Sequence, residues 1–330
     1  MKKDQSETKR NNLFYQNFEL LEIISSGSCG KVYKSKFKNL KTKKFSACKF
    51  INSKNDGNGE KRENYNLKKG ITEVLIHSKL KHKNIPDIYG FYTMKEVNCI
   101  AMEYEEFGDL QNFKVNIIKK KNFPETFISY LSHEILEAIS FIHKNKIIHM
   151  DIKPQNVLID KFLNVKLTDF SVSIKYKSSN KYIKLPRVGT SCYMSPEVLK
   201  QEKILVEEAS KIDIYSFGVL LYSLYFCDYP YDLRNIKSKE YEIILKNIEE
   251  NKLDFHKKIS FSEMFKNFLK KCLEKDITKR YNIYEAMKDP WVKASSIILD
   301  QKEKINDAGK FLISMLTNNI LEFNEYVNIK

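Results

Sequence analysis

The sequence of 330 residues lacks long apolar runs and has no cysteines arranged for metal binding. No apolar stretch approaches the length of about 20 residues that a membrane-spanning helix requires. The six cysteines are scattered, without a CxxC pair or a histidine at zinc spacing, at positions 29, 48, 99, 192, 227 and 272. The start, MKKDQSETKR, lacks the apolar core of a signal peptide. These absences predict a soluble intracellular protein with reduced thiols, in the cytoplasm, the nucleus or both.

The formal net charge of +15 comes mainly from lysine. An excess of basic residues is compatible with binding to nucleic acid, to an anionic membrane or to an acidic protein partner. Arg and Lys do not cluster with aromatic residues, so a diffusely basic surface is the simpler interpretation. Nucleic-acid binding therefore rests on net charge alone. The chain has no internal repeat, and its length suffices for two substantial lobes with a large core.

The stretch HMDIKPQNVL, residues 149–158, holds polar side chains between apolar runs. Asp151 precedes Lys153 and Asn156, and Asp169 follows in the turn LTDFS. Phosphoryl transfer from ATP requires a carboxylate that orients a hydroxyl, a cation beside the moving phosphate and two oxygen ligands for Mg²⁺. These four side chains match those roles in that order. The alternative interpretation is a polar surface loop, since a short motif needs its structural context.

The segment FELLEIISSGSCGKVYK, starting at Phe18, predicts two strands joined by a glycine turn. Gly27 and Gly30 allow the backbone to approach a triphosphate closely, and Val32 would then lie over a purine base. The alternative is a hairpin whose glycines only join two strands. Ser25 stands where a third glycine is common, which predicts a stiffer turn.

A lysine in the apolar strand FSACKFI needs an anionic partner, because an unpaired buried ammonium is costly. Glu73, in the predicted helix GITEVLIHSKL, is the candidate partner of this residue, Lys49. His77 lies on the same helical face as Glu73, where an apolar side chain is expected. A buried histidine satisfied by the core is therefore favoured over a ligand or a catalytic base.

The predicted secondary structure changes from strands to helices after two further predicted strands, residues 88–92 and 98–102. Helical patterns follow the connector EYEEFGDL, in which Asp109 begins a helix, so we place a boundary near residue 105. The run IDIYSFGVLLYSLYF, residues 212–226, is apolar nearly all round, as in a buried central helix. Another long helix, ending before residue 149, is predicted by a stripe of Phe127, Leu131, Ile135, Ala138 and Ile142.

In their order, these motifs resemble a eukaryotic protein kinase domain over residues 18–292. The resemblance rests on the glycine turn, ACK, the helical glutamate, HMDIKPQN, DFS, SPE, the IDIYSFG helix and a late arginine. It implies an α+β fold with a small N-lobe of antiparallel sheet and one main helix, residues 18–104. A larger, mainly helical C-lobe would span residues 105–292. Residues 1–17 are expected to be disordered and residues 293–330 to form a helical extension.

The resemblance also implies a role for each motif residue. Lys49 would hold the α- and β-phosphates of ATP and pair with Glu73. Asp151 would be the catalytic base, and Lys153 would neutralise the γ-phosphate. Mg²⁺ or Mn²⁺ would be bound by two ligands, Asn156 and Asp169. The nucleotide would be lined by Ile24, Ser25, Gly27, Gly30, Val32, Ala47, Lys49, the gatekeeper Met102, the hinge residues Glu103 and Glu105, Asp109 and Leu158.

Three further features follow from the resemblance. Glu197 would pair with Arg280, and Asp213 would anchor the catalytic loop. Lys153 and Thr190 resemble the Ser/Thr class rather than the Tyr class, so protein Ser and Thr hydroxyls would be the acceptors. The stretch EVLIHSKL resembles polo-like kinases, whereas DFSVSIKY…VGTSCYMSPE resembles calmodulin-dependent kinase kinases, and no subfamily is assigned.

The sequence departs from the family pattern at two positions beside the motifs. Met150 stands where many members have an arginine that pairs with a phosphate on the activation loop. It cannot make that pair, so we expect activity without obligatory phosphorylation of Ser178 or Ser179. Ser171 stands where nearly all members have the DFG glycine. Together with Ser25, these departures support the alternative of a pseudokinase that acts as a nucleotide-binding or scaffold protein.

Two parts of the sequence, the region expected to contact substrates and the C-terminal extension, indicate which partners the chain binds. Neutral Gln155 and Ser223 stand where kinases that select arginine upstream of the target carry acidic residues. The loop after Asp169 is basic, which predicts that acidic substrates are tolerated or preferred; alternatively its lysines are only a solvated face. These basic residues are Lys175, Lys177, Lys181, Lys184 and Arg187. The C-terminal extension would dock on the C-lobe or bind a partner through Leu312, Met315, Leu316, Ile320 and Phe323.

Overall fold

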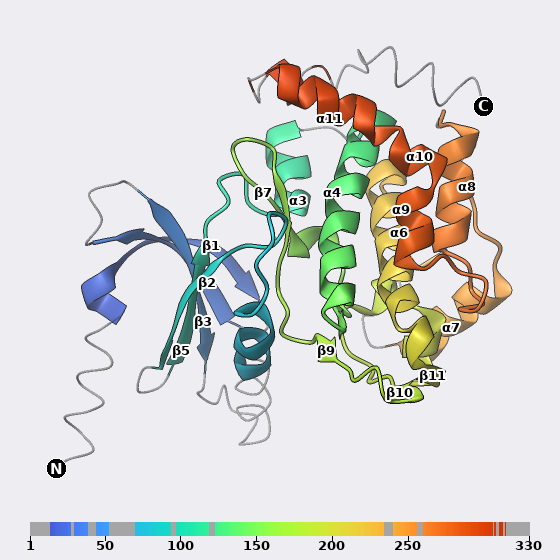
Figure 1. Ribbon diagram of the computed structural model, residues 1–330, viewed down its shortest axis with the longest axis horizontal. Helices are drawn as coiled ribbons and strands as arrows, with labels where there is room; N and C mark the ends of the chain where they lie inside the picture. Colours follow the sequence, from blue (N-terminus) through green and yellow to red (C-terminus); the bar gives the residue numbers. More distant parts are fainter. Residues whose placement is uncertain are drawn as a thin grey trace. The chain divides into compact units, whose positions relative to one another are not determined.

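The computed structural model describes residues 14–27, 30–38, 44–52, 70–93, 97–118, 123–233, 240–255, 260–305, 307, 310–312 and 314. The chain divides into two compact units. The first comprises Met1–Glu106 with Asp169–Ser171, and the second comprises Phe107–Thr168 with Val172–Lys330. Each unit has its own core and is described by itself (Figure 1). Within the described ranges, no helix combines the length and the apolarity needed to cross a membrane.

One antiparallel sheet of five strands, in the order β1-β2-β3-β5-β4, forms the first unit together with a helix over residues 70–77. Its strands are β1 (Phe18–Gly27), β2 (Gly30–Phe37), β3 (Phe45–Asn52), β4 (Ile88–Thr93) and β5 (Val97–Glu103). The predicted strands and the helix that carries Glu73 are thus confirmed. Gly30 is required after the turn, because its φ is +135° and a Cβ would lie 1.8 Å from the Phe50 carbonyl oxygen.

The chain enters the first unit through an aromatic cluster. Residues 14–17 are helical, and Phe14 is fully buried against Phe18, Cys48 and Cys99. The rings of Phe14 and Phe18 stack with centroids 5.3 Å apart. The expected disorder therefore does not extend to residues 14–17, because burying Phe14 offsets the entropy cost of ordering them. Residues 1–13 and 53–69 lie outside the described part of the chain.

Helices make up most of the second unit, with α4 and α6 packed against each other (Figure 1). All five residues of the predicted α4 stripe are buried, and α6 is buried nearly all round, as predicted. The helices are α3 (Leu110–Asn112), α4 (Glu125–Lys144), α5 (Pro196–Leu199), α6 (Ser210–Phe226), α7 (Tyr241–Glu250), α8 (Glu263–Cys272), α9 (Ile283–Lys288), α10 (Pro290–Lys293) and α11 (Ser295–Lys304). A π-helical segment, η1 (Phe113–Ile118), continues α3.

Short strand pairs and 3₁₀ turns shape the loops of the second unit. The pairs are β6 (Ile147–Ile148) with β9 (Ile174–Lys175), β7 (Val157–Ile159) with β8 (Val165–Leu167), and β10 (Tyr182–Lys184) with β11 (Lys203–Leu205). The turns are η2 (Pro154–Asn156), η3 (Ser191–Tyr193) and η4 (Val206–Glu208). These pairs hold the segments on both sides of the stretch 149–158 in place.

The described part of the C-terminal extension packs on α4. Lys302 of α11 donates hydrogen bonds to the Tyr130 hydroxyl at 2.6 Å and to Asn164 Oδ1 at 3.0 Å. Phe311 is buried with its ring edge-on to Tyr130, at a centroid distance of 5.7 Å. This part of the extension, α11 and Phe311, thus packs within the second unit, and docking of the predicted stripe stays a prediction. Of the predicted stripe, Met315, Leu316, Ile320 and Phe323 lie outside the described residues.

Candidate active site

A buried ion-pair network centres on Lys49 in the first unit. Strand β3 carries Lys49, and its Nζ lies 2.8 and 3.0 Å from the two carboxylate oxygens of Glu73. The predicted pair is therefore present. Asp169 Oδ1 also accepts a hydrogen bond from the same ammonium, at 2.9 Å. The sequence did not reveal this second partner, which lies 120 residues further along the chain.

Electrostatics keep this ammonium charged. Burial alone would lower the pKa of Lys49, but the carboxylates of Asp169 and Glu73 outweigh it and raise that pKa above its ordinary value. Burial raises the pKa of Glu73, while the Lys49 charge opposes this effect. The Asp169 side chain remains 28% exposed. The network thus presents a fixed cation next to an accessible carboxylate, which suits a phosphate and its metal ion.

An apolar surface formed by β2, β3 and β5 lies in the same unit. Ala47 and Met102 face each other in the β3–β5 register. Both are buried in one cluster with Ile100, and Val32 packs against that cluster. On β1, Ile24 and Ser25 are exposed. The predicted nucleotide-lining residues on β2, β3 and β5 are therefore brought together on one sheet.

Glu103 at the end of β5 and two residues of the connector that follows, Glu105 and Asp109, belong to the predicted nucleotide lining. The Glu103 carboxylate accepts a hydrogen bond from the Asp87 amide at 3.1 Å, and Glu105 is buried. In the second unit, Asp109 caps α3 by accepting from the Asn112 amide N–H at 2.9 Å and from its side chain at 2.6 Å. Asp109 also forms an isolated bridge with Leu158. The Asp109 carboxylate is therefore already engaged in helix capping.

The histidine on the Glu73 helix is a core residue. His77 is 1% exposed, and its Nε2 lies 2.6 Å from the Pro86 carbonyl oxygen. Its ring packs on Phe170, with centroids 4.9 Å apart. His77 is therefore a core residue, as expected, and its Nε2 is hydrogen-bonded.

The stretch 149–158 places two polar side chains, Lys153 and Asn156, against the Asp151 carboxylate in the second unit. Asp151 Oδ1 accepts a hydrogen bond from the Thr190 amide at 2.8 Å. Its Oδ2 accepts from Lys153 Nζ at 2.7 Å and from Asn156 Nδ2 at 3.1 Å. Lys153 also donates to the Thr190 hydroxyl at 2.7 Å. The carboxylate is thus held in one orientation by three donors.

Asp213 of α6 fixes the backbone that leads into Asp151. It is fully buried and accepts from the amides of His149 and Met150, at 2.8 and 3.0 Å, and contacts His143 Nε2 at 2.7 Å. Burial alone would raise the pKa of Asp213, but the hydrogen bond with His143 and the nearby histidines hold it below its ordinary value. Met150 has a φ of 69°, a strained conformation that these hydrogen bonds support. The predicted anchor is present.

A second buried ion pair lies below the segment that ends in SPE. Arg280 donates to both carboxylate oxygens of Glu197, at 2.6 and 3.1 Å. It also donates to the carbonyl oxygens of Glu274 at 2.7 Å and of Lys211 at 3.1 Å. Arg280 is 1% exposed. The predicted pair is therefore present and satisfied by further acceptors, as a buried charge requires.

The position that departs from the DFG pattern does not need glycine. Ser171 is buried, and its amide donates to Asp169 Oδ1 at 3.4 Å. The left-handed conformation of this turn is adopted by Asp169, with a φ of 66°, and not by Ser171. A side chain at position 171 is thus accommodated without backbone strain.

The fold and these side-chain clusters agree with the comparison to known proteins. A family model described as "Protein kinase domain" matches residues 18–292, and the chain belongs to this family. The Arabidopsis thaliana protein "Serine/threonine-protein kinase TIO" is 28% identical over 297 residues, covering 87% of this chain and 20% of that protein. The Dictyostelium discoideum "Serine/threonine-protein kinase dst2" is 31% identical over 277 residues, covering 83% and 22%.

A third relative is closer in length. The "Aurora kinase" of Eremothecium gossypii is 27% identical over 288 residues, which cover 86% of this chain and 71% of that protein. The chain spans about a fifth of the length of the first two relatives. All three relatives are named as kinases, in agreement with the family. Their names differ from one another, so the subfamily stays unassigned.

Proposed function

We propose that this chain is an active Ser/Thr protein kinase that transfers the γ-phosphate of ATP to protein hydroxyls. The observation that supports this most is the environment of Asp151. An ionised carboxylate offers about four acceptor positions. Thr190, Lys153 and Asn156 occupy three of them. One position remains, on the oxygen that receives only the Thr190 amide, for the hydroxyl of a substrate.

In this proposal each charged residue has one task. Asp151 orients the acceptor hydroxyl and takes its proton. Lys153, already 2.7 Å from the Thr190 hydroxyl, neutralises charge on the γ-phosphate. Lys49, held by Glu73, binds the α- and β-phosphates. Since phosphoryl transfer depends mainly on positioning and charge stabilisation, these tasks account for the reaction.

Asn156 and Asp169 would hold Mg²⁺ or Mn²⁺. Both offer the hard oxygen atoms that these ions prefer, and the Asp169 carboxylate is partly exposed. When bound, the ion would neutralise charge on the phosphates. The nucleotide would be lined by Ile24, Ser25, Gly27, Gly30, Val32, Ala47, Met102, Glu103, Glu105 and Leu158. Asp109 would contact the ribose through the acceptor positions that its two helix-cap hydrogen bonds leave open.

We further propose that the catalytic domain spans residues 18–292 and is active without obligatory phosphorylation of Ser178 or Ser179. The buried thioether of Met150 offers no charge to a phosphate. The activation segment is held by other contacts: β9 pairs with β6, β10 pairs with β11, and Thr190 contacts Asp151 and Lys153. These contacts do not involve either serine.

The substrates of the proposed kinase tolerate or prefer acidic surroundings. Gln155 and Ser223 offer no carboxylate to a substrate arginine. Lys175, Lys177 and Lys184 are exposed on the segment that precedes Thr190. Arg187 is instead engaged with Glu242, at 3.4 Å. A positional-scanning peptide array tests this proposal, and strong selection for arginine two or three residues upstream of the target would contradict it.

The proposed activity is tested with purified protein, γ-labelled ATP, Mg²⁺ and a peptide library, followed by phosphoamino-acid analysis. Label on Ser and Thr is expected for the wild type. Asp169→Asn should reduce the rate by several orders of magnitude, since it removes a charge that acts on the transferring phosphate. Equal background labelling by wild type and Asp169→Asn would contradict the proposal and favour the pseudokinase alternative.

A further inference from the structure

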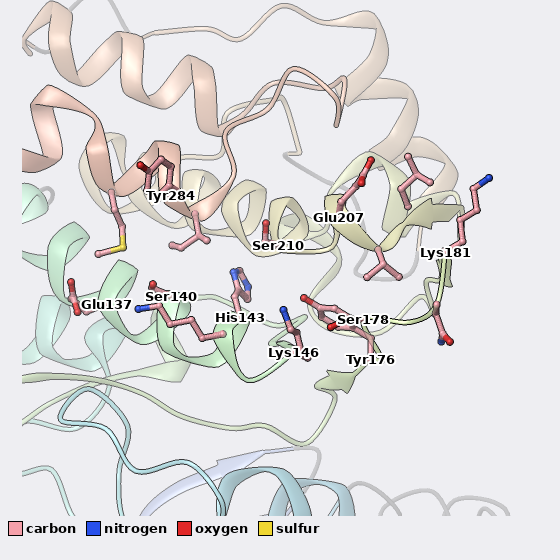
Figure 2. A pocket seen from close by; sticks show the side chains of 16 residues that line it. Glu137, Ser140, His143, Lys146, Tyr176, Ser178, Lys181, Glu207, Ser210 and Tyr284 are labelled. Carbon is pink, nitrogen blue, oxygen red and sulfur yellow. The ribbon is translucent and has the colours of Figure 1, made fainter.

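A groove of about 950 Å³ opens on the second unit, apart from the residues around Asp151 (Figure 2). Its lining carries carboxylates as well as ammonium groups, since Glu137 and Glu207 lie in it together with three lysines. This mixed charge does not select one class of ligand. A contact elsewhere in the same unit, between an ammonium and a thiol, is chemically more specific.

Lys114 has a buried ammonium group that faces a sulfur atom. It lies in η1 and is only 8% exposed. Its Nζ donates hydrogen bonds to the Leu224 carbonyl oxygen at 2.9 Å and to Cys227 Sγ at 3.1 Å, and it lies 5.6 Å from the centroid of the Phe123 ring. Throughout the described ranges, no carboxylate lies within 4.0 Å of this ammonium. A buried cation is costly unless an anion compensates it, and among these three partners only the sulfur can become an anion.

Cys227 ends α6 in a backbone conformation that favours glycine. It is the C-cap of this helix, with a φ of 58° in the left-handed region. A β-carbon is strained there, so the cysteine has a cost in stability that glycine would not have. The residue is exposed to solvent, although the ammonium that contacts it is buried. An oxidant in solution can therefore reach Cys227, while Lys114 holds the sulfur from within the protein.

The distance between the two side chains suits a reaction. Reacting atoms in a productive arrangement lie about 3–3.5 Å apart, and Lys114 Nζ and Cys227 Sγ are 3.1 Å apart. Reactive thiols lie in partly exposed surroundings beside a cation, because the cation stabilises the thiolate that attacks an oxidant. The first oxidised form of a thiol, a sulfenic acid, condenses with a nitrogen to a sulfenamide. Lys114 supplies such a nitrogen in contact with the sulfur.

We propose that Lys114 and Cys227 are an oxidation-dependent crosslink site, at which hydrogen peroxide joins the two side chains by a sulfur–nitrogen bond. The bond connects η1, which continues the helix that Asp109 begins, with the end of α6. The two residues are 113 positions apart in the sequence. Linking positions so far apart stabilises the folded chain because it restricts the unfolded one. The crosslink therefore stabilises the second unit when the chain meets a peroxide.

Two steps account for all atoms and electrons. In the first, the Cys227 sulfur attacks one oxygen of hydrogen peroxide, the oxygen–oxygen bond breaks, and a sulfenic acid and one water molecule form. In the second, the amine of Lys114, having lost a proton to solvent, attacks this sulfur, and the leaving hydroxide takes up a further amine proton and departs as water. Sulfur is oxidised by two electrons, and the peroxide is reduced by two. Two molecules of a small thiol such as glutathione reverse the reaction and become a disulfide.

The test treats full-length protein with hydrogen peroxide, stops the reaction with catalase and digests the chain without a reducing agent. Tandem mass spectrometry should find the peptides of Lys114 and Cys227 joined, with the mass of their sum less two hydrogen atoms. Dithiothreitol should separate them again. The thermal unfolding midpoint of the treated protein should rise by at least about 5 °C and return after reduction.

Two variants of the lysine separate the crosslink from ordinary thiol oxidation. Lys114→Arg keeps a cation beside the sulfur but has no amine, and Lys114→Met removes both while filling a similar volume. Both variants should lose the crosslink and the rise in the unfolding midpoint. Alkylation of Cys227 by iodoacetamide should be at least about tenfold slower in Lys114→Met than in the wild type, and Lys114→Arg should restore it.

The proposal is overturned if Cys227 stays unmodified in peroxide, or is oxidised to sulfinic or sulfonic acid without a link to Lys114. A link from Cys227 to a different lysine would also overturn it, as would equal alkylation rates of the wild type and Lys114→Met. None of these measurements involves turnover, so an inactive enzyme would contradict the proposed function without affecting this test.

Discussion

Replacing Gly189 by alanine should disturb Asp151 through the backbone alone. Gly189 precedes Thr190, whose amide donates to Asp151 Oδ1 at 2.8 Å. Its φ is +103°, a conformation that L side chains rarely adopt. An added Cβ would lie 2.4 Å from the carbonyl oxygen of Met150 and 3.3 Å from Asp151 Oδ1. The first contact is with backbone that Asp213 holds, so the segment of residues 189–190 has to move away.

The size of this effect follows from two costs. A strained backbone conformation costs about 1–3 kcal/mol. Losing a hydrogen bond to a charged group costs about 1.5–3 kcal/mol. We therefore expect Gly189→Ala to lower the free energy of unfolding by about 2.5–6 kcal/mol. If the misplaced carboxylate loses about 1.4–2.8 kcal/mol of transition-state stabilisation, kcat falls about tenfold to a hundredfold.

Gly108 provides a matched control for the strain. Its φ is also positive, +69°, but an added Cβ would meet nothing within 4 Å. Gly108→Ala should therefore cost only about 1–2 kcal/mol of stability and leave kcat nearly unchanged. Urea unfolding and initial rates of peptide phosphorylation measure both quantities. Equal stability and equal kcat for Gly189→Ala and Gly108→Ala would refute the argument.

Three further predictions concern buried contacts of the second unit. Glu197→Gln should lower the free energy of unfolding, measured by urea titration, by about 3 kcal/mol, because it leaves the buried charge of Arg280 uncompensated. As a control, Glu242→Gln breaks an exposed ion pair and should cost less than about 1 kcal/mol in the same titration. The pKa of Asp213 is held below 3.8, so its contribution to stability is present above that pH and is lost at lower pH. The stability difference between wild type and Asp213→Asn should therefore shrink as the pH falls below about 4, which urea titrations at each pH would show. Lys302→Ala removes three hydrogen bonds that hold α11, one to Tyr130 of α4 and two to Leu163 and Asn164 ahead of β8, so limited proteolysis of the extension should become about tenfold faster, about 1.4 kcal/mol; an unchanged rate would argue against docking through this residue.

Sequence patterns predicted the elements of this fold because burial leaves a periodic trace in them. The α4 stripe, the apolar α6 and the alternating strands follow directly from which side chains must avoid water. The Lys49–Glu73 pair was predictable for a related reason, since a lysine in an apolar strand requires a partner. The contact of Lys49 with Asp169 was not predictable, because it depends on how segments far apart in the sequence pack together.

Features that depend on backbone geometry or surface shape left no such trace. The positive φ of Met150 and Asp169 cannot be read from their side chains, which give no sign of it. Asp109 was expected to begin a helix, and it does. That both of its carboxylate oxygens accept hydrogen bonds from Asn112 became visible only in the structure. The burial of Phe14 also arises from packing between segments that are far apart in sequence.

The central claim is that Asp151 serves a phosphoryl transfer reaction in a chain that binds ATP. Its most direct test compares wild type with Asp151→Asn, which keeps the size of the side chain but replaces one acceptor oxygen by an amide NH₂ donor. ATP binding is measured by calorimetry with Mg²⁺, and transfer of labelled γ-phosphate to a Ser/Thr peptide is measured in the same preparations. The account predicts equal ATP affinity and a transfer rate at least a thousandfold lower for Asp151→Asn, about 4 kcal/mol of barrier. Equal transfer rates, or no transfer above background by the wild type, would contradict it.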